Sequence, residues 1–162
     1  MEKVAIDDVD IETSPLGVHS VRRPVSRALD TSDFAMNYFE LEPGDSFSGG
    51  LHTHHDQEEV FYVQEGTATF EVGRDRETRE VAPGECIRFS PGEFQVGYND
   101  SEESVTGFAL GAPKASHDFA ELESIVPCRE CGEETAHGLA LTDDGAFQFT
   151  CNECGNEFEM GT

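Results

Sequence analysis

Apolar and polar side chains alternate over short segments through the middle of the chain, and this period of two predicts strands. The run Val60-Phe61-Tyr62-Val63 is β-branched and aromatic, and Ala68, Phe70 and Val72 alternate with polar neighbours. Turn-forming pairs recur between such segments, at Pro43-Gly44, Pro83-Gly84, Pro91-Gly92 and Asn99-Asp100. The pattern predicts an all-β sandwich or barrel that begins near Phe34.

The pattern changes on both sides of this predicted barrel. Residues 1 to 29 show no clear period, so we expect an N-terminal arm. In residues 113 to 126, apolar side chains from Phe119 to Val126 recur at intervals of three and four, which predicts a linker with a short helix docked on the barrel. Residues 127 to 162 form a separate tail.

Two histidines and a glutamate precede the central apolar run. His52 and His54 are two residues apart, so on a strand their imidazoles point to the same face. Glu59 follows five residues later, and Glu65-Gly66 behind it predicts a tight hairpin turn. Two neutral imidazoles and one carboxylate on one side of an ion leave coordination positions open. The triplet therefore predicts a metal site, against the alternative of surface histidines beside an acidic loop.

These residues resemble the first conserved motif of the cupin superfamily, which runs His, any residue, His, four residues, Glu, six residues, Gly. His52, His54, Glu59 and Gly66 occupy those positions. The resemblance covers roughly residues 30 to 112. It implies a jelly-roll β-barrel that holds one divalent Fe, Mn, Ni or Zn ion, and it implies a homodimer.

The second cupin motif is matched less well. It usually supplies a histidine as a fourth ligand, and this chain has Gln95 at that position. Gly84, Gly92 and Asn99 are in register, whereas Ser90 replaces a proline. Gln95 either gives its amide oxygen to the metal as a weaker, neutral ligand or lies behind the ligands and hydrogen-bonds to the substrate. The sequence leaves both roles open.

Candidates for substrate contact come from the residues around this site. Phe61 shares the face of Glu59 by strand parity, so we expect it to line the barrel beside the ion. Arg88 is the one charged residue in an otherwise apolar segment. Inside the barrel it would bind a carboxylate or phosphate, and outside it would pair with a surface carboxylate. Gln95 and Tyr98 complete the set.

Two classes of function fit this site. In the first, the protein is an enzyme whose open metal position polarises an oxygen-bearing substrate or binds dioxygen. The resemblance implies metal-dependent dioxygenases, isomerases and decarboxylases, without ranking them. In the second, the barrel binds or senses a small molecule without turnover. A general acid or base beside the ion would favour an enzyme, and the sequence places neither Glu58 nor Tyr98 in that role.

The tail carries a second metal motif. Cys128 and Cys131 are followed after 19 residues by Cys151 and Cys154, and two residues separate the cysteines of each pair. This spacing predicts a structural zinc site, with two disulfides as the alternative. The tail resembles a zinc ribbon, with a hairpin at Thr142-Asp143-Asp144-Gly145. Its eight acidic residues and one basic residue argue against nucleic acid and favour a structural or protein-contact role.

Composition adds a strong negative charge. Ten basic residues against 34 acidic ones give a formal charge of −24, and only Lys3 and Lys114 are lysines. Such self-repulsion destabilises a compact state at low salt, and the composition resembles that of extreme halophiles. No run of about 18 apolar residues exists, so we expect no membrane-spanning helix. The acidic N-terminus lacks the features of a signal peptide, so we expect a cytoplasmic protein.

Overall fold

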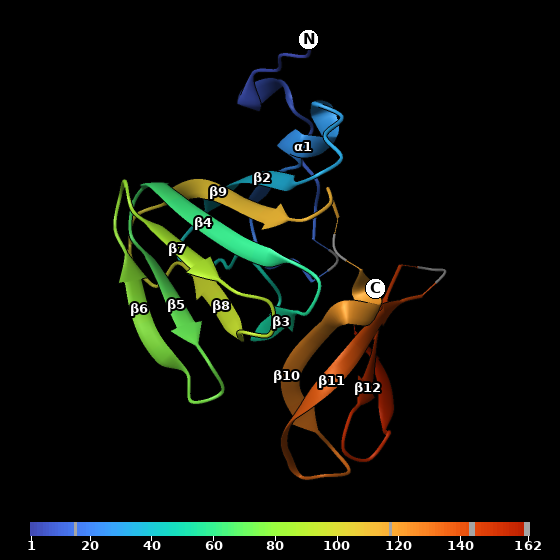
Figure 1. Cartoon of the computed structure of the whole chain (residues 1–162). Coiled ribbons are helices and arrows are strands. Elements are labelled where there is room, and N and C mark those ends of the chain that lie inside the picture. Colours follow the sequence, from blue (N-terminus) through green and yellow to red (C-terminus); the bar gives the residue numbers. More distant parts are fainter. Residues whose placement is uncertain (15, 117, 143–144, 161–162) are drawn as a thin grey trace.

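The computed structural model describes residues 1–14, 16–116, 118–142 and 145–160, and it is mostly β-strand (Figure 1). Its strands are β1 (Val21–Arg23), β2 (Ala35–Leu41), β3 (His52–His54), β4 (Glu58–Glu65), β5 (Ala68–Val72), β6 (Glu77–Val81), β7 (Cys86–Phe89), β8 (Gln95–Tyr98), β9 (Val105–Ala112), β10 (Leu122–Cys128), β11 (Glu133–Leu141), β12 (Phe147–Cys151) and β13 (Glu157–Met160). Its helical turns are η1 (Ile6–Asp8), α1 (Val25–Ala28) and η2 (Phe119–Glu121). The predicted all-β class is confirmed.

The strands form two sheets that face each other. The first sheet has the order β1-β2-β9-β4-β7, and the second has the order β13-β12-β11-β10-β3-β8-β5-β6. β1 lies in the segment predicted as an arm, and it pairs with β2 at the edge of the first sheet. Figure 1 shows the first sheet above β5, β6 and β8, with β10, β11 and β12 extending away from the barrel. Among the described residues, no helix is long and apolar enough to cross a membrane.

Aromatic rings fill the space between the two sheets. Phe47, Phe61, Phe70 and Phe89 are all buried, and the centroids of their contacting rings lie 5.0 to 6.1 Å apart. Rings at these separations gain contact energy beyond the burial of their area. The middle of the barrel is therefore a packed core, as its small size requires.

Gly66 marks a crossing between the sheets, so the predicted hairpin turn at Glu65-Gly66 is wrong. β4 pairs with β7 and β9, whereas β5 pairs with β6 and β8. Gly66 has a φ of +72°, and a Cβ there would lie 2.5 Å from the carbonyl oxygen of Ser104. A tight hairpin turn and a crossing between sheets can both use a glycine with positive φ between two alternating segments. The local sequence therefore does not distinguish the two kinds of connection.

The segment after the barrel also differs from its prediction. In place of a helix from Phe119 to Val126, the chain makes the single turn η2 and then enters β10. β10 pairs with β3 of the barrel on one side and with β11 of the tail on the other. This pairing overrides the weak helical period, because strand formation depends on neighbours that the local sequence does not reveal.

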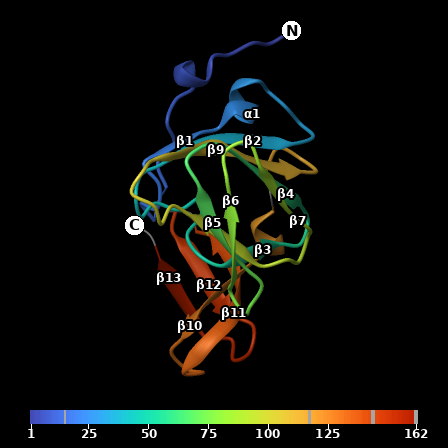
Figure 2. The ribbon, with the colours of Figure 1, turned by 90° about the vertical axis from the view of Figure 1, so that its left-hand side faces the viewer.

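The tail is thus part of the second sheet. β11 and β12 pair from Leu141 and Phe147 to His137 and Cys151, which is the predicted hairpin. Asp143 and Asp144 of its turn lie outside the described residues. Figure 2 shows β10, β11, β12 and β13 together below the barrel strands.

Candidate metal sites of the barrel and the tail

Three strands bring the predicted barrel ligands together. His52 and His54 are the two ends of β3, Glu59 is the second residue of β4, and Gln95 is the first residue of β8. His52 and Gln95 are opposite each other in the β3–β8 ladder, so their side chains stand on the same face. Ligand atoms of His52, His54 and Glu59 all lie within 4.8 Å of one another. The structure therefore assembles the triplet that the spacing predicts.

The three side chains converge from a largely buried position. Glu59 Oε2 lies 3.9 Å from His52 Nε2, and Glu59 Oε1 lies 3.6 Å from His54 Nε2. On the other side of its ring, His52 Nδ1 lies 2.9 Å from the carbonyl oxygen of Gly50. A proton donated from Nδ1 to that oxygen leaves Nε2 with a lone pair that faces Glu59. His52 is oriented as a metal ligand.

Burial raises the pKa of the Glu59 carboxyl, and His52 together with a hydrogen bond from Gln95 lowers the pKa in part. Removal from water disfavours the charged form of a carboxyl group. A divalent cation at the point where the three ligands meet would restore the lost stabilisation of the carboxylate. The chemistry of Glu59 therefore fits a bound metal.

Gln95 lies directly against the ligands and is only 1% exposed. Its Nε2 donates to Glu59 Oε2 at 2.7 Å and lies 3.3 Å from His52 Nε2. Its Oε1 is buried without a hydrogen-bond partner. A half-turn of the amide exchanges its nitrogen and its oxygen and turns the oxygen toward the ligand atoms. An unsatisfied buried oxygen beside the triplet fits a fourth, neutral ligand.

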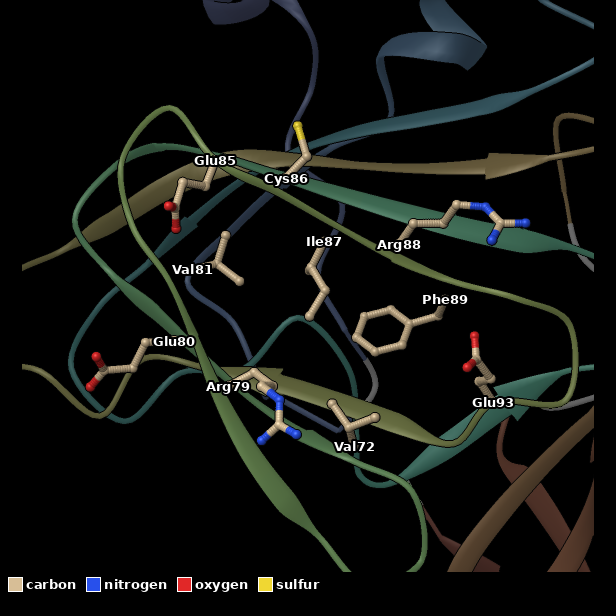
Figure 3. Close-up of a pocket in the computed structure, with 10 residues that line it drawn as sticks. All are labelled: Val72, Arg79, Glu80, Val81, Glu85, Cys86, Ile87, Arg88, Phe89 and Glu93. Atoms are coloured by element: carbon tan, nitrogen blue, oxygen red, sulfur yellow. The ribbon is translucent and has the colours of Figure 1, made fainter.

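A small cavity adjoins the triplet. It measures about 10 Å³ and is lined by Thr53, His54, Gln57, Glu59, Phe89, Ser90, Glu93 and Gln95. Its volume matches about one water molecule. Phe89 and Glu93 also line a larger pocket of about 600 Å³ between β6 and β7 (Figure 3). The small cavity beside the metal site and the larger pocket therefore share Phe89 and Glu93 in their walls.

The larger pocket has an apolar floor and a charged rim. In Figure 3, Ile87 and Phe89 point into the space that Val72 and Val81 face, whereas Cys86 and Arg88 point to the other side of β7. The charged residues at the rim are Arg79, Glu80, Glu85, Arg88 and Glu93. The rim therefore carries more negative than positive charge.

Three residues predicted to contact substrate are placed elsewhere. Phe61 is buried in the aromatic core and lines neither of the two cavities described above. The Arg88 guanidinium is exposed, and its Nε lies 2.6 Å from Glu58 Oε2, so the outward alternative holds. Tyr98 is three residues after Gln95 on β8 and faces the opposite side of the sheet. Of the predicted set, Gln95 alone lies at the site.

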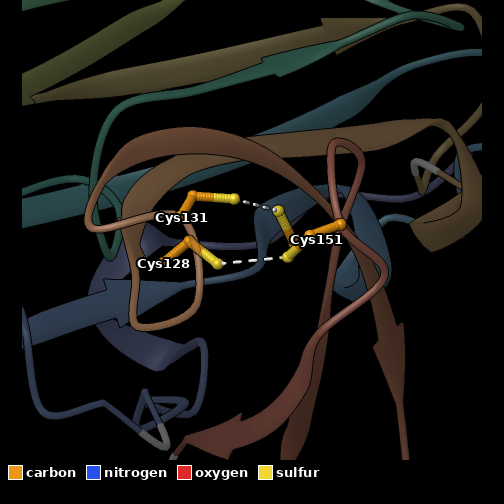
Figure 4. Close-up of side chains that lie close together, drawn as sticks. Cys128, Cys131 and Cys151 are labelled. Carbon is orange, nitrogen blue, oxygen red and sulfur yellow. Dashed lines mark hydrogen bonds between the residues drawn. The ribbon is translucent and has the colours of Figure 1, made fainter.

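The second candidate site is the cysteine cluster of the tail (Figure 4). Cys128 Sγ lies 3.6 Å from Cys154 Sγ, and Cys131 Sγ lies 3.9 Å from Cys151 Sγ. Four sulfurs about 2.3 Å from a tetrahedral zinc ion are about 3.8 Å apart, whereas a disulfide bond is about 2.05 Å long. All four cysteines are free. The cluster therefore fits one metal ion, and the disulfide alternative is wrong.

One cysteine of this cluster is prepared as a thiolate. Thr135 Oγ1 lies 3.2 Å from Cys151 Sγ. Its hydrogen bond, together with hydrogen bonds from the backbone of Cys154 and Glu153, lowers the pKa of Cys151 to about 6. Metals bind the thiolate form of cysteine. The thiolate form of Cys151, which is the form that binds a metal ion, is therefore favoured at neutral pH.

Comparison with known proteins agrees with the fold and the motif. Residues 37–110 match the family model of the cupin domain, and comparison with curated proteins finds no match. A sugar phosphate isomerase of the cupin superfamily from Silicibacter pomeroyi aligns over 99% of this chain and 93% of its own, with a TM-score of 0.63 and 19% identity. The polyketide cyclase RemF from Streptomyces resistomycificus aligns over 80% of this chain and 88% of its own, with a TM-score of 0.65 and 20% identity. The barrel of this chain is therefore a cupin domain.

Proposed function

We propose that this protein is a metal-dependent enzyme that acts on a small oxygen-bearing molecule, with the ion held by His52, His54 and Glu59. The observation that carries the proposal is the convergence of these three ligands beside a small cavity that shares Phe89 and Glu93 with a larger pocket. A divalent ion in such a site supplies Lewis-acid chemistry or, if it is iron, one-electron chemistry with dioxygen. We also propose that Cys128, Cys131, Cys151 and Cys154 hold a structural zinc ion.

The pocket between β6 and β7 is the place that we propose for the substrate. Val72, Val81 and Ile87 offer apolar contact for its less polar part. Phe89 lines both this pocket and the small cavity, and we propose that its apolar ring limits the access of water to the ion. An oxygen atom of the substrate would enter the small cavity in place of water.

The charges around the pocket favour an uncharged substrate. Arg79 pairs with Glu77 at 2.6 Å, and Arg88 pairs with Glu58, so both arginines are already engaged. The glutamates at the rim repel anions. A phosphate group would need free cations, so the sugar phosphate specificity named for the structural neighbour is not what we propose here.

Among the described residues that line the small cavity, Glu93 is the one acid–base group outside the triplet. Hydrogen bonds from Ser90 lower the pKa of the Glu93 carboxyl, which makes it a weak base at neutral pH. An isomerase needs a base with a pKa near the working pH, whereas an oxygenase needs none. We therefore place an oxygenase ahead of an isomerase.

A binding module without turnover is the second candidate. The cavity beside the triplet holds about one water molecule, and this favours a site that binds a ligand at its edge rather than one that encloses a substrate. The two candidates differ in whether a product forms.

Oxygen consumption tests the proposal. The anaerobically purified protein is loaded with Fe²⁺ and mixed in air with small diketones, enols and phenols. We expect oxygen consumption that requires both Fe²⁺ and one of the added compounds. This activity should be lost in Glu59→Ala and should persist in Glu58→Ala. Glu58 is the matched control, because it adjoins Glu59 but pairs outward with Arg88. Deuterium exchange into a compound without oxygen consumption would contradict an oxygenase, and binding with neither would favour the binding module.

A further inference from the structure

The strand that carries both histidines is held more by the tail than by the barrel. β3 spans only His52–His54. Toward the barrel, it pairs with β8 at one position, His52 with Gln95. Toward the tail, it pairs with β10 at three positions, His54 with Leu122, Thr53 with Glu123 and His52 with Ser124. Without β10, the ligand strand would be a short edge strand, held by its one pair with β8 and by the hydrogen bond that Gly92 N donates to His54 O at 2.9 Å.

Backbone hydrogen bonds and apolar packing extend this attachment beyond both ends of β3. Ile125 N donates to Leu51 O at 2.8 Å, and His55 N donates to Glu121 O at 2.8 Å. Ile125 also packs in a buried cluster whose other members are Leu51, Phe94, Val96 and Ala136. The cluster joins residues of the barrel to residues of β10 and β11. Residues 51 to 55 are therefore tied along their whole length to residues 121 to 125, the end of η2 and the start of β10.

β10 is tied in turn to the cysteine cluster. It ends at Cys128, and it pairs over six positions with β11, whose Thr135 contacts Cys151. One side chain provides a direct bridge, since Asn152 lies between Cys151 and Cys154 and its Nδ2 donates to Glu123 Oε1 at 2.8 Å. Oε2 of the same carboxylate lies 3.3 Å from His55 Nε2.

A continuous path therefore runs from the second cysteine pair through Asn152 and Glu123 to the residue that follows His54. Each step of this path is a hydrogen bond or an ion pair between neighbouring elements. A metal bound by the four cysteines would fix the position of Asn152 at one end, and the ligand strand lies at the other.

We infer that the four-cysteine centre positions the barrel site: its metal fixes β10, and β10 fixes the direction in which His52 and His54 point. The inference rests on the proposed barrel metal. A small zinc module owes its folding to its metal, so loss of zinc loosens β10. Partners that orient metal ligands matter almost as much to metal affinity as the ligands themselves. Removal of zinc, or oxidation of the thiols, then weakens metal binding in the barrel.

Mn²⁺ affinity tests this coupling in the zinc-loaded full chain. Imidazole and carboxylate ligands accept Mn²⁺, whereas thiolates prefer zinc, so Mn²⁺ detected by electron paramagnetic resonance reports on the barrel alone. Asn152→Ala removes the bridge and keeps all four cysteines. Glu153→Ala is the matched control, because Glu153 is the exposed neighbour in the same loop. We expect the Kd for Mn²⁺ to rise about tenfold in Asn152→Ala, to rise further in Cys151→Ser/Cys154→Ser, and to stay unchanged in Glu153→Ala.

Hydrogen exchange provides a second readout that needs no barrel metal. We expect the amides of residues 51 to 55 to exchange faster in Asn152→Ala and in the double cysteine variant than in the wild type and Glu153→Ala. Unchanged Mn²⁺ affinity and unchanged exchange would overturn the inference. If exchange responds but no protein binds Mn²⁺, the positioning of β3 stands and the proposed barrel metal is what fails.

Discussion

Gln95 decides how strongly the barrel can hold an ion. Its amide nitrogen now occupies the lone pairs of Glu59 and His52 that a metal would use. A bound ion must break these hydrogen bonds. The amide oxygen of Gln95 then binds a borderline metal ion more weakly than an imidazole nitrogen would. We expect moderate metal affinity from this residue choice.

Replacement of Gln95 by histidine is expected to raise the affinity of the barrel for Ni²⁺ by about tenfold or more, because imidazole is the stronger ligand for Ni²⁺. Calorimetric titration of zinc-loaded protein measures the change. Gln64→His serves as control, because Gln64 is exposed on β4 and a histidine there tests for adventitious binding. Equal Ni²⁺ affinity in wild type and Gln95→His would exclude residue 95 from the ligand set.

At the scale of single residues, the three candidate metal ligands could be predicted from the sequence, whereas the residues that line the pocket could not. His52, His54 and Glu59 lie within eight residues of one another, so strand parity is enough to bring them together. Phe89 reaches the site only because it is opposite Glu59 in the β4–β7 ladder. A shift of that ladder by one residue would exchange Phe89 with Arg88, and no local pattern fixes such a register.

At the scale of elements, β10 makes the tail a continuation of the second barrel sheet. The cysteine spacing predicted that the four cysteines gather, and they do, but residues 113 to 126 were expected to be a linker with a short helix. Leu122–Cys128 form β10 instead. Their pairing with both β3 and β11 makes the module and the barrel parts of one sheet. Long-range pairing of this kind leaves no trace in the local period of apolar residues.

Ile125→Ala is expected to lower the free energy of unfolding by about 2 to 5 kcal/mol, because Ile125 is only 8% exposed and packs on both the barrel and β11. Urea denaturation at high salt measures the loss. Ile11→Ala, at a residue that is 48% exposed, is the control and should change stability by less than about 0.5 kcal/mol. A wild type that unfolds in two separate steps would contradict the shared core.

At the scale of the whole molecule, charge sets the conditions for folding. The formal charge of −24 persists whatever ion pairs form. Many of the basic residues are already paired, for example Arg22 and Arg27 with Glu12 and Arg76 with Glu71 and Glu134. The surplus carboxylates repel one another over the surface, and this repulsion opposes the compact state.

We propose that the fold is adapted to high salt and predict that the Tm rises as KCl increases from about 0.1 to 2 M. The screening length falls from about 10 Å at 0.1 M to about 3 Å at 1 M, which suppresses repulsion between neighbouring carboxylates. Thermal unfolding followed by circular dichroism checks this, with sucrose as an uncharged control. A Tm that stays constant or falls over this range would argue against adaptation to salt.

The central claim is that His52, His54 and Glu59 hold a metal ion separate from the one held by the four cysteines. Elemental analysis of protein purified anaerobically in high salt tests it most directly, on the wild type, Glu59→Ala and Glu58→Ala. We expect zinc and a second ion in the wild type and in Glu58→Ala, and zinc alone in Glu59→Ala, because loss of one of three ligands removes the barrel site. Full occupancy by the second ion in Glu59→Ala would contradict the assignment of the barrel ligands.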